Sequence, residues 1–130
     1  MTTAAIAAAF GFLVIAAFQA ALALGAPLGR AAWGGASATL PSRLRRASAA
    51  SAVIWLAAVV VILGRVGIEI VPLPTSVMFV GAWVLVVLSG LAAIVNFASS
   101  SRWERFRWGP LALVLAFLSL LVAVSESARG

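Results

Sequence analysis

The chain has no histidine, cysteine, aspartate, lysine or tyrosine. These absences exclude several kinds of catalytic site, because a Ser-His-Asp triad, a thiol nucleophile and a Schiff-base lysine all need side chains that are missing. The usual cysteine and histidine ligands of zinc are missing too. We therefore expect no enzymatic activity, no bound metal and no cofactor.

Charged residues are scarce as well. They make up 9% of the 130 residues, whereas apolar residues make up 65% and the mean hydropathy is +1.20. Soluble domains are about 25% charged and about 45–50% apolar. Polar side chains are too few here to cover the apolar ones in water, so we expect lipid to cover much of the surface.

The charges divide the sequence into long apolar windows. A membrane-spanning helix needs about 20 mostly apolar residues. Windows long enough for this are 1–29, 47–64, 70–101 and 108–125. The sequence therefore predicts an all-α fold, a single domain that is an integral membrane bundle of four transmembrane helices.

Glycine, proline and serine residues at the window ends set the expected helix limits. We predict helices at about 4–24, 47–66, 77–98 and 109–124, with basic loops at 25–46 and 99–108. The start of the last helix has two interpretations, because Pro110 suits either its first turn or a kink in a longer helix. Ser101 and Glu104 have the spacing of a capping box, which favours a helix start there.

Arginine is unevenly distributed between the two sides of the predicted bundle. One side has seven arginines and the other has two, Arg65 and Arg129. The seven are Arg30, Arg43, Arg45, Arg46, Arg102, Arg105 and Arg107. The positive-inside rule places these seven in the cytoplasm and both termini outside. They are candidate contacts for anionic lipid headgroups, and because they lie beside membrane spans, the net charge of +6 does not indicate nucleic acid binding.

Gln19 and Asn96 are the only side-chain amides in the chain, and both fall within predicted spans. Both helices run towards the arginine-rich side, so the two amides lie in the same half of the membrane. A hydrogen bond between them would act as a structural clasp, worth about 0.6 kcal/mol. The alternatives are a polar site for a substrate or water that both residues line, and simple contact between Asn96 and interfacial water.

Arg65 and Glu69 form a candidate ion pair at the outer face. Their four-residue spacing places them one helical turn apart, where they can pair, although Glu before Arg is the better order on a helix. Such an exposed pair contributes little to stability. As a functional site it would be an outer gate or a proton-linked switch.

Small residues recur at four-residue spacing in the first and fourth predicted helices. Examples are Ala17-x-x-x-Ala21-x-x-x-Gly25 and Ser119-x-x-x-Ala123. Such faces let helix backbones approach closely in lipid. They are compatible with packing inside the bundle, with a homo-oligomer or with a larger membrane partner.

The five tryptophans divide into two groups by position. Trp33, Trp103 and Trp108 flank predicted spans on the arginine-rich side, as expected of an aromatic belt. Trp55 and Trp83 lie further inside their helices, where we expect packing or contact with lipid rather than ligand stacking.

The first loop carries a recognisable pattern: Gly-Ala-Pro-Leu-Gly-Arg-Ala-Ala-Trp-Gly-Gly at 25–35, then Leu-Pro at 40–41 and Leu-Arg at 44–45. With Asn96, Ser99, Ser101, Glu104-Arg105 and Pro110 further on, the chain resembles a group of uncharacterised small bacterial four-span membrane proteins. The resemblance implies the fold and a location in the bacterial cell (inner) membrane. It implies no activity.

Two functional hypotheses follow. The preferred one is a small accessory or scaffold subunit that acts by helix packing within the membrane. The alternative is a small transporter or channel component with a polar site near Gln19 and Asn96. A water-filled cavity that reaches Asn96 would favour the transporter, and a dry packed interior would favour the scaffold.

The predicted orientation is open to a direct test. A reporter domain fused after Gly130 should read as external, because the positive-inside rule retains the seven-arginine side in the cytoplasm. Paired reporters that are active only outside or only inside the cell provide the measurement. A fusion that reads as cytoplasmic contradicts the orientation.

Overall fold

The structure is a computed structural model that describes residues 1–125. Over these residues it is all-helical and contains no strand. The main helices are α1 (Thr2–Ala23), α2 (Ser42–Arg65), α3 (Thr75–Phe97) and α4 (Gly109–Val124). Each is long and apolar enough to cross a membrane, the last when counted as Glu104–Val124. The prediction of an all-α bundle with four candidate spans is confirmed, and these helices fit a multi-pass membrane protein.

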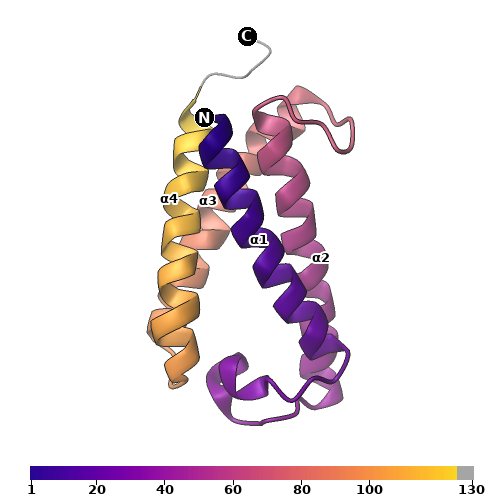
Figure 1. The fold of residues 1–130 in the computed structure, drawn as a ribbon, viewed down its shortest axis with the longest axis vertical. Helices are drawn as coiled ribbons and strands as arrows, with labels where there is room; N and C mark the ends of the chain where they lie inside the picture. Colours follow the sequence, from indigo (N-terminus) through magenta and orange to yellow (C-terminus); the bar gives the residue numbers. More distant parts are fainter. Residues whose placement is uncertain (126–130) are drawn as a thin grey trace.

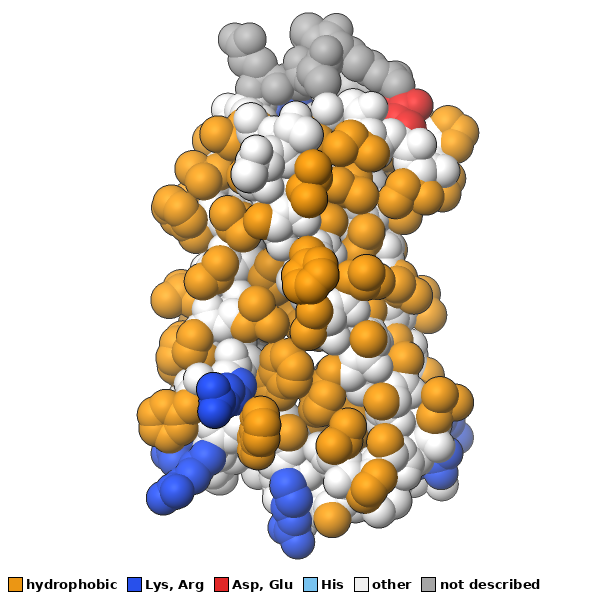
Figure 2. All heavy atoms as spheres, in the orientation of Figure 1, with side chains coloured by type: hydrophobic (Ala, Val, Ile, Leu, Met, Phe, Trp, Pro, Cys, Tyr) orange, Lys and Arg blue, Asp and Glu red, His pale blue; other side chains and the backbone are white. Residues whose placement is uncertain are grey.

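The four helices form two antiparallel hairpins. α1 packs mainly against α2, and α3 packs mainly against α4. The N-terminus and the end of α4 lie at one end of the bundle, and the loop between α1 and α2 lies at the other (Figure 1). Figure 2 shows arginine side chains gathered at that loop end. We call it the arginine-rich end.

The α2 helix begins earlier than the predicted limit of residue 47. It starts at Ser42, directly after Pro41, whose extended backbone (φ −65°, ψ 160°) precedes the first turn. Three of the predicted loop arginines, Arg43, Arg45 and Arg46, therefore lie in the first turns of α2. The prediction was wrong here because charge limits membrane burial without limiting helix formation, and arginine is a good helix former.

The start of α4 combines the two interpretations of Pro110. Helical backbone begins at Arg102 and passes through a π-helical turn at Glu104–Trp108 before α4 proper. The Gly109 N–H donates to the Glu104 carbonyl, five residues back. Proline lacks an N–H and its ring crowds the carbonyl four residues before it. The wider turn accommodates both, so Pro110 lies near the start of α4 and within a longer helix.

The main hydrophobic core fills the bundle away from the arginine-rich end. All four helices contribute to it: its buried residues are Ala5, Ala8, Ala9, Phe12, Ala58, Ile62, Leu85, Leu115 and Val122. The hairpins approach closely at Gly81, where an added Cβ would lie 2.7 Å from a Val61 methyl carbon. A second, smaller core of Leu22, Ala32 and Leu40 lies under the first loop.

The two predicted small-residue motifs differ in how far they are buried. Ser119 and Ala123 are buried in the bundle, whereas Ala17 is exposed and Ala21 is half-buried. The first helix instead buries Ala5, Ala8, Ala9, Phe12 and Ala16, which follow the helical period. The motif in α4 therefore serves internal packing.

Candidate functional site

A cavity of about 750 Å³ lies at the arginine-rich end of the bundle. All four helices line it, and the loop between α1 and α2 contributes Ala31, Ala32, Trp33 and Gly34. It forms because the hairpins pack closely through the main core and diverge towards this end (Figure 1). Its size falls within the range of about 300–1,000 Å³ typical of small-molecule sites.

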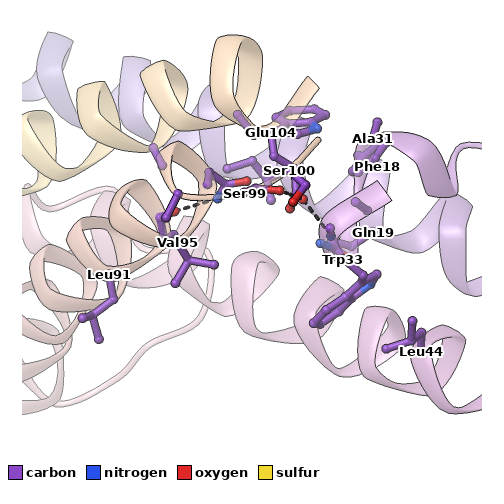
Figure 3. A pocket seen from close by; sticks show the side chains of 18 of the residues that line it. Phe18, Gln19, Ala31, Trp33, Leu44, Leu91, Val95, Ser99, Ser100 and Glu104 are labelled. Carbon is purple, nitrogen blue, oxygen red and sulfur yellow. Dashed lines mark hydrogen bonds between the residues drawn. The ribbon is translucent and has the colours of Figure 1, made fainter. Parts of the chain in front are cut away.

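The lining changes from polar to apolar along the cavity. Ser99, Ser100 and Glu104 form the polar end beside the loops, and Ile15 and Leu91 lie deeper. Figure 3 shows Ser99 and Glu104 close together, with Val95 between them and Leu91. A molecule with one polar and one apolar end therefore suits this lining better than a uniformly polar one.

Gln19 and Asn96 both line this cavity, so the structure brings the two intramembrane amides to one site. The structure gives no hydrogen bond between them. The Asn96 Nδ2 donates to the carbonyl of Ala92 in its own helix, at 2.6 Å. The Gln19 Oε1 is buried and has no hydrogen-bond partner among the described residues. This arrangement matches the shared polar site rather than the clasp.

Aromatic rings form much of the cavity wall. Trp55 stacks on the buried Phe12, with ring centroids 5.5 Å apart, and this pair separates the cavity from the main core. The rings of Phe18 and Trp108 pack together on another wall, with their centroids 4.6 Å apart. The Trp108 Nε1 is buried and unbonded within residues 1–125. Trp55 and Trp108 therefore line the cavity, a position that the sequence analysis did not predict.

Trp33 is fixed by an unusual backbone conformation and a buried partner. Its φ of 49° lies in the left-handed region, which is uncommon for a residue other than glycine. Its Nε1 donates to the Ser48 Oγ at 2.9 Å, and Ser48 is fully buried on α2. The indole therefore has a set position at the cavity, although Trp33 remains 40% exposed.

The Glu104 carboxylate connects the two loops at the aqueous end of the cavity. Its Oε1 accepts the Gly34 N–H at 2.8 Å and the Ser99 hydroxyl at 2.6 Å. The side chain is only 9% exposed. Hydrogen bonds to an ionised acceptor are stronger than neutral ones, so Glu104 holds the first loop over the cavity.

The capping box is present in part. The Ser101 Oγ accepts the Glu104 N–H at 3.4 Å, as the spacing predicted. The reciprocal bond differs, because the Ser101 N–H donates to the Ser99 Oγ and the Glu104 carboxylate serves the other loop. The Ser101 hydroxyl also donates to the Arg30 carbonyl at 2.8 Å, which adds a second bond between the loops.

The exposed lining residues locate the mouth of the cavity. Leu91 and Val95 on α3 are 54% and 65% exposed, and Arg43 on α2 is also exposed. The lining residues of α1 and α4 are half-buried or buried. Exposed lining residues also occur at the loop end, at Trp33, Gly34, Ala98 and Ser100. The cavity therefore opens both between α2 and α3, on the side of the bundle, and beside the loops.

Two arginines from the predicted sets bind helix ends instead. The Arg45 Nε donates to the Ala23 carbonyl at the end of α1, at 3.1 Å. Arg65, only 5% exposed, donates through Nη2 to the Ser125 carbonyl at 2.6 Å, beyond the end of α4. A cation is favoured at the negative end of a helix dipole. Both arginines therefore join neighbouring helices.

Arg65 and Glu69 are not one turn apart on a continuous helix. α2 ends at Arg65, and Gly67 follows with a φ of 91°. The Ile68 N–H bonds the Leu63 carbonyl at 2.9 Å, which completes a Schellman turn. The expected one-turn spacing is therefore wrong, because the helix ends between the two residues, and the outer-face pair itself stays a prediction. The predicted helix limit of residue 66 agrees with this end to within one residue.

The other candidate headgroup arginines remain at the arginine-rich end. Exposed there are Arg30, Arg43, Arg46, Arg102 and Arg107. Arg30 also donates to the carbonyls of Gly35 and Ala36 within its own loop. Arg105 is half-buried, with its guanidinium 5.5 Å from the centroid of the Phe106 ring.

Comparisons with protein-family models, with curated proteins and with solved structures give no match to this chain. The resemblance to small bacterial four-span proteins therefore stays a prediction, and the function is argued from the cavity alone.

The Glu104 hydrogen bonds predict a large effect of one substitution. Glu104→Ala leaves the Gly34 N–H and the Ser99 hydroxyl without their acceptor, which should cost about 1–3 kcal/mol of folding stability. Thermal unfolding in detergent measures this as a lower Tm. The matched control is Arg102→Ala, at an exposed site in the same helical segment, which should stay within about 0.5 kcal/mol of the parent. Equal Tm values for the two variants would contradict the role of Glu104.

Proposed function

We propose that this chain is a small membrane transport component that binds its solute in the cavity at the arginine-rich end. The observation that carries the proposal is the position of Gln19 and Asn96 on one cavity of about 750 Å³. Amide groups are costly in a lipid-facing position and useful beside a ligand. The Gln19 Oε1 is buried and has no partner in the described chain, so a solute would reach this acceptor only after the side chain or the helices move.

The geometry favours a carrier over an open channel. The cavity occupies one end of the bundle, and the main core fills the rest. The Phe12–Trp55 stack closes the cavity on the core side, and a packed core of this kind excludes water. A solute would cross only if the hairpins rearrange, so transport by this chain requires a conformational change or a partner subunit.

The scaffold hypothesis has less support. Its small-residue faces would have to be free for a partner, yet Ser119 and Ala123 are buried within the bundle. In the α1 motif, Ala17 is exposed but Ala21 is half-buried, and Gly25 lies beyond the end of the helix. The proposal includes no catalytic step and no cofactor.

We further propose that the arginine-rich end faces the cytoplasm of a bacterial cell. The support is the seven-to-two distribution of arginine, together with the position of both loops at one end. The cavity would then open towards the cytoplasmic leaflet.

Cysteine labelling tests whether the cavity is accessible. The chain has no native cysteine, so single-cysteine variants need no altered background. Asn96→Cys should react with a water-soluble maleimide in lipid nanodiscs, because a hydrated cavity allows the thiol to ionise. The readout is the labelled fraction by mass spectrometry.

The matched control is Ile94→Cys, two residues away on α3. Ile94 is 66% exposed on the outer surface of the bundle and does not line the cavity. It should label at least about tenfold more slowly, since an apolar environment suppresses the thiolate. Equal, slow labelling at both positions would mean a dry interior and would favour the scaffold hypothesis.

A further inference from the structure

We propose that the cavity binds an anionic phospholipid, with an acyl chain inserted between α2 and α3 and the phosphate beside Arg43. This inference rests on the proposed function and names the chemical class of the ligand. Three features carry it: the side opening of the cavity, the polarity gradient of its lining, and the charge at its polar end.

The cavity has a side opening towards lipid, and the first loop covers only part of its loop end, where Trp33, Gly34 and Ser100 are exposed. The side opening lies between α2 and α3, where Leu91 and Val95 are exposed. On a membrane-spanning helix these apolar side chains face hydrocarbon. The first loop is held at the aqueous end by the bonds from Glu104 to Gly34 and from Ser101 to Arg30. A ligand dissolved in the bilayer reaches this site directly through the side opening.

The cavity has the elongated, amphipathic shape of a lipid. Its lining on α2 extends from Arg43 to Trp55, which is about 18 Å of helix at 1.5 Å per residue. This is more than half of the hydrocarbon thickness of about 30 Å. Arg43 lies at the polar end and Trp55 and Leu91 at the apolar end. An acyl chain matches this length and gradient, whereas a compact solute would occupy only part of it.

The charge at the polar end favours an anionic headgroup. Arg43 is exposed and lines the cavity, and a guanidinium pairs well with phosphate oxygens. The opposing Glu104 carboxylate already accepts two hydrogen bonds through its Oε1, which offset part of its charge. Ser100, which is exposed and lines the cavity, supplies a further donor at this end.

Tryptophan quenching by brominated lipid tests this inference. Three of the five tryptophans, Trp33, Trp55 and Trp108, line the cavity, and Trp83→Phe with Trp103→Phe removes the other two. The full chain is placed in phosphatidylcholine nanodiscs. Phosphatidylglycerol with brominated acyl chains is then compared with phosphatidylcholine brominated in the same way, each at the same low mole fraction. The titration is repeated with all five native tryptophans, so that the result does not depend on the double variant.

We expect the anionic lipid to quench with an apparent affinity about fivefold higher than that of phosphatidylcholine, the preference that one arginine near a headgroup provides. Arg43→Gln should abolish the preference. Arg46→Gln is the matched control, because Arg46 is exposed on the same helix and does not line the cavity. Ala92→Phe, which fills part of the cavity, should weaken quenching by both lipids.

Three results would overturn the inference. They are equal quenching by the two lipids, equal effects of Arg43→Gln and Arg46→Gln, and quenching by a brominated fatty acid without quenching by phosphatidylglycerol. Its failure is distinguishable from failure of the proposed function. Rapid labelling of Asn96→Cys without a lipid preference leaves an accessible cavity for another solute. Because a bound lipid shields this position in nanodiscs, labelling is repeated after delipidation in detergent, and Asn96→Cys that stays unreactive there removes the transport proposal itself.

Discussion

The buried carboxylate of Glu104 is the interaction on which the arginine-rich end depends. The hairpins diverge there, so helix packing holds them together less than it does in the main core. Glu104 compensates by accepting hydrogen bonds from Gly34 of the first loop and from Ser99, next to its own segment. A buried carboxylate is stable only when its hydrogen bonds are satisfied. This requirement fixes the loop in place, and the loop in turn covers part of the aqueous end of the cavity.

Two arginines connect neighbouring helices, and the number of charges in the sequence does not predict this. Arg45, at the start of α2, binds the end of α1, and Arg65, at the other end of α2, binds the backbone beyond α4. Each places a cation at the negative end of a helix dipole. α2 therefore connects to two neighbours through its charged ends. Among the remaining exposed arginines, Arg43 is the one that also lines the cavity.

The architecture follows from the sequence because lipid imposes a simple rule on it. A span must be helical and about 20 apolar residues long, so twelve charges were enough to locate four helices. The start of α2 was misplaced because the same rule says nothing about helical residues outside the hydrocarbon. The end of α2 was predicted to within one residue, because Gly67 marks it in the sequence.

The site was predictable only in part. The shared half-membrane position of Gln19 and Asn96 followed from helix direction, but their relation did not, because it depends on how far the hairpins diverge. The Ser101 and Glu104 spacing signalled a local cap. It gave no sign that the carboxylate would bind Gly34, seventy residues away. The place of the tryptophans in the cavity was the hardest part to predict. A tryptophan at a membrane interface and one in a cavity wall occupy similar sequence positions, at or near the ends of apolar segments.

Amide hydrogen exchange at Gly34 tests the central claim most directly. Gly34 lies in an exposed loop, where an amide normally exchanges at close to its intrinsic rate. Residue-resolved NMR on the protein in micelles would follow this one N–H. If Glu104 holds the loop, the Gly34 amide is protected in the parent protein and loses that protection in Glu104→Ala. Exchange at the intrinsic rate in the parent protein would contradict the account.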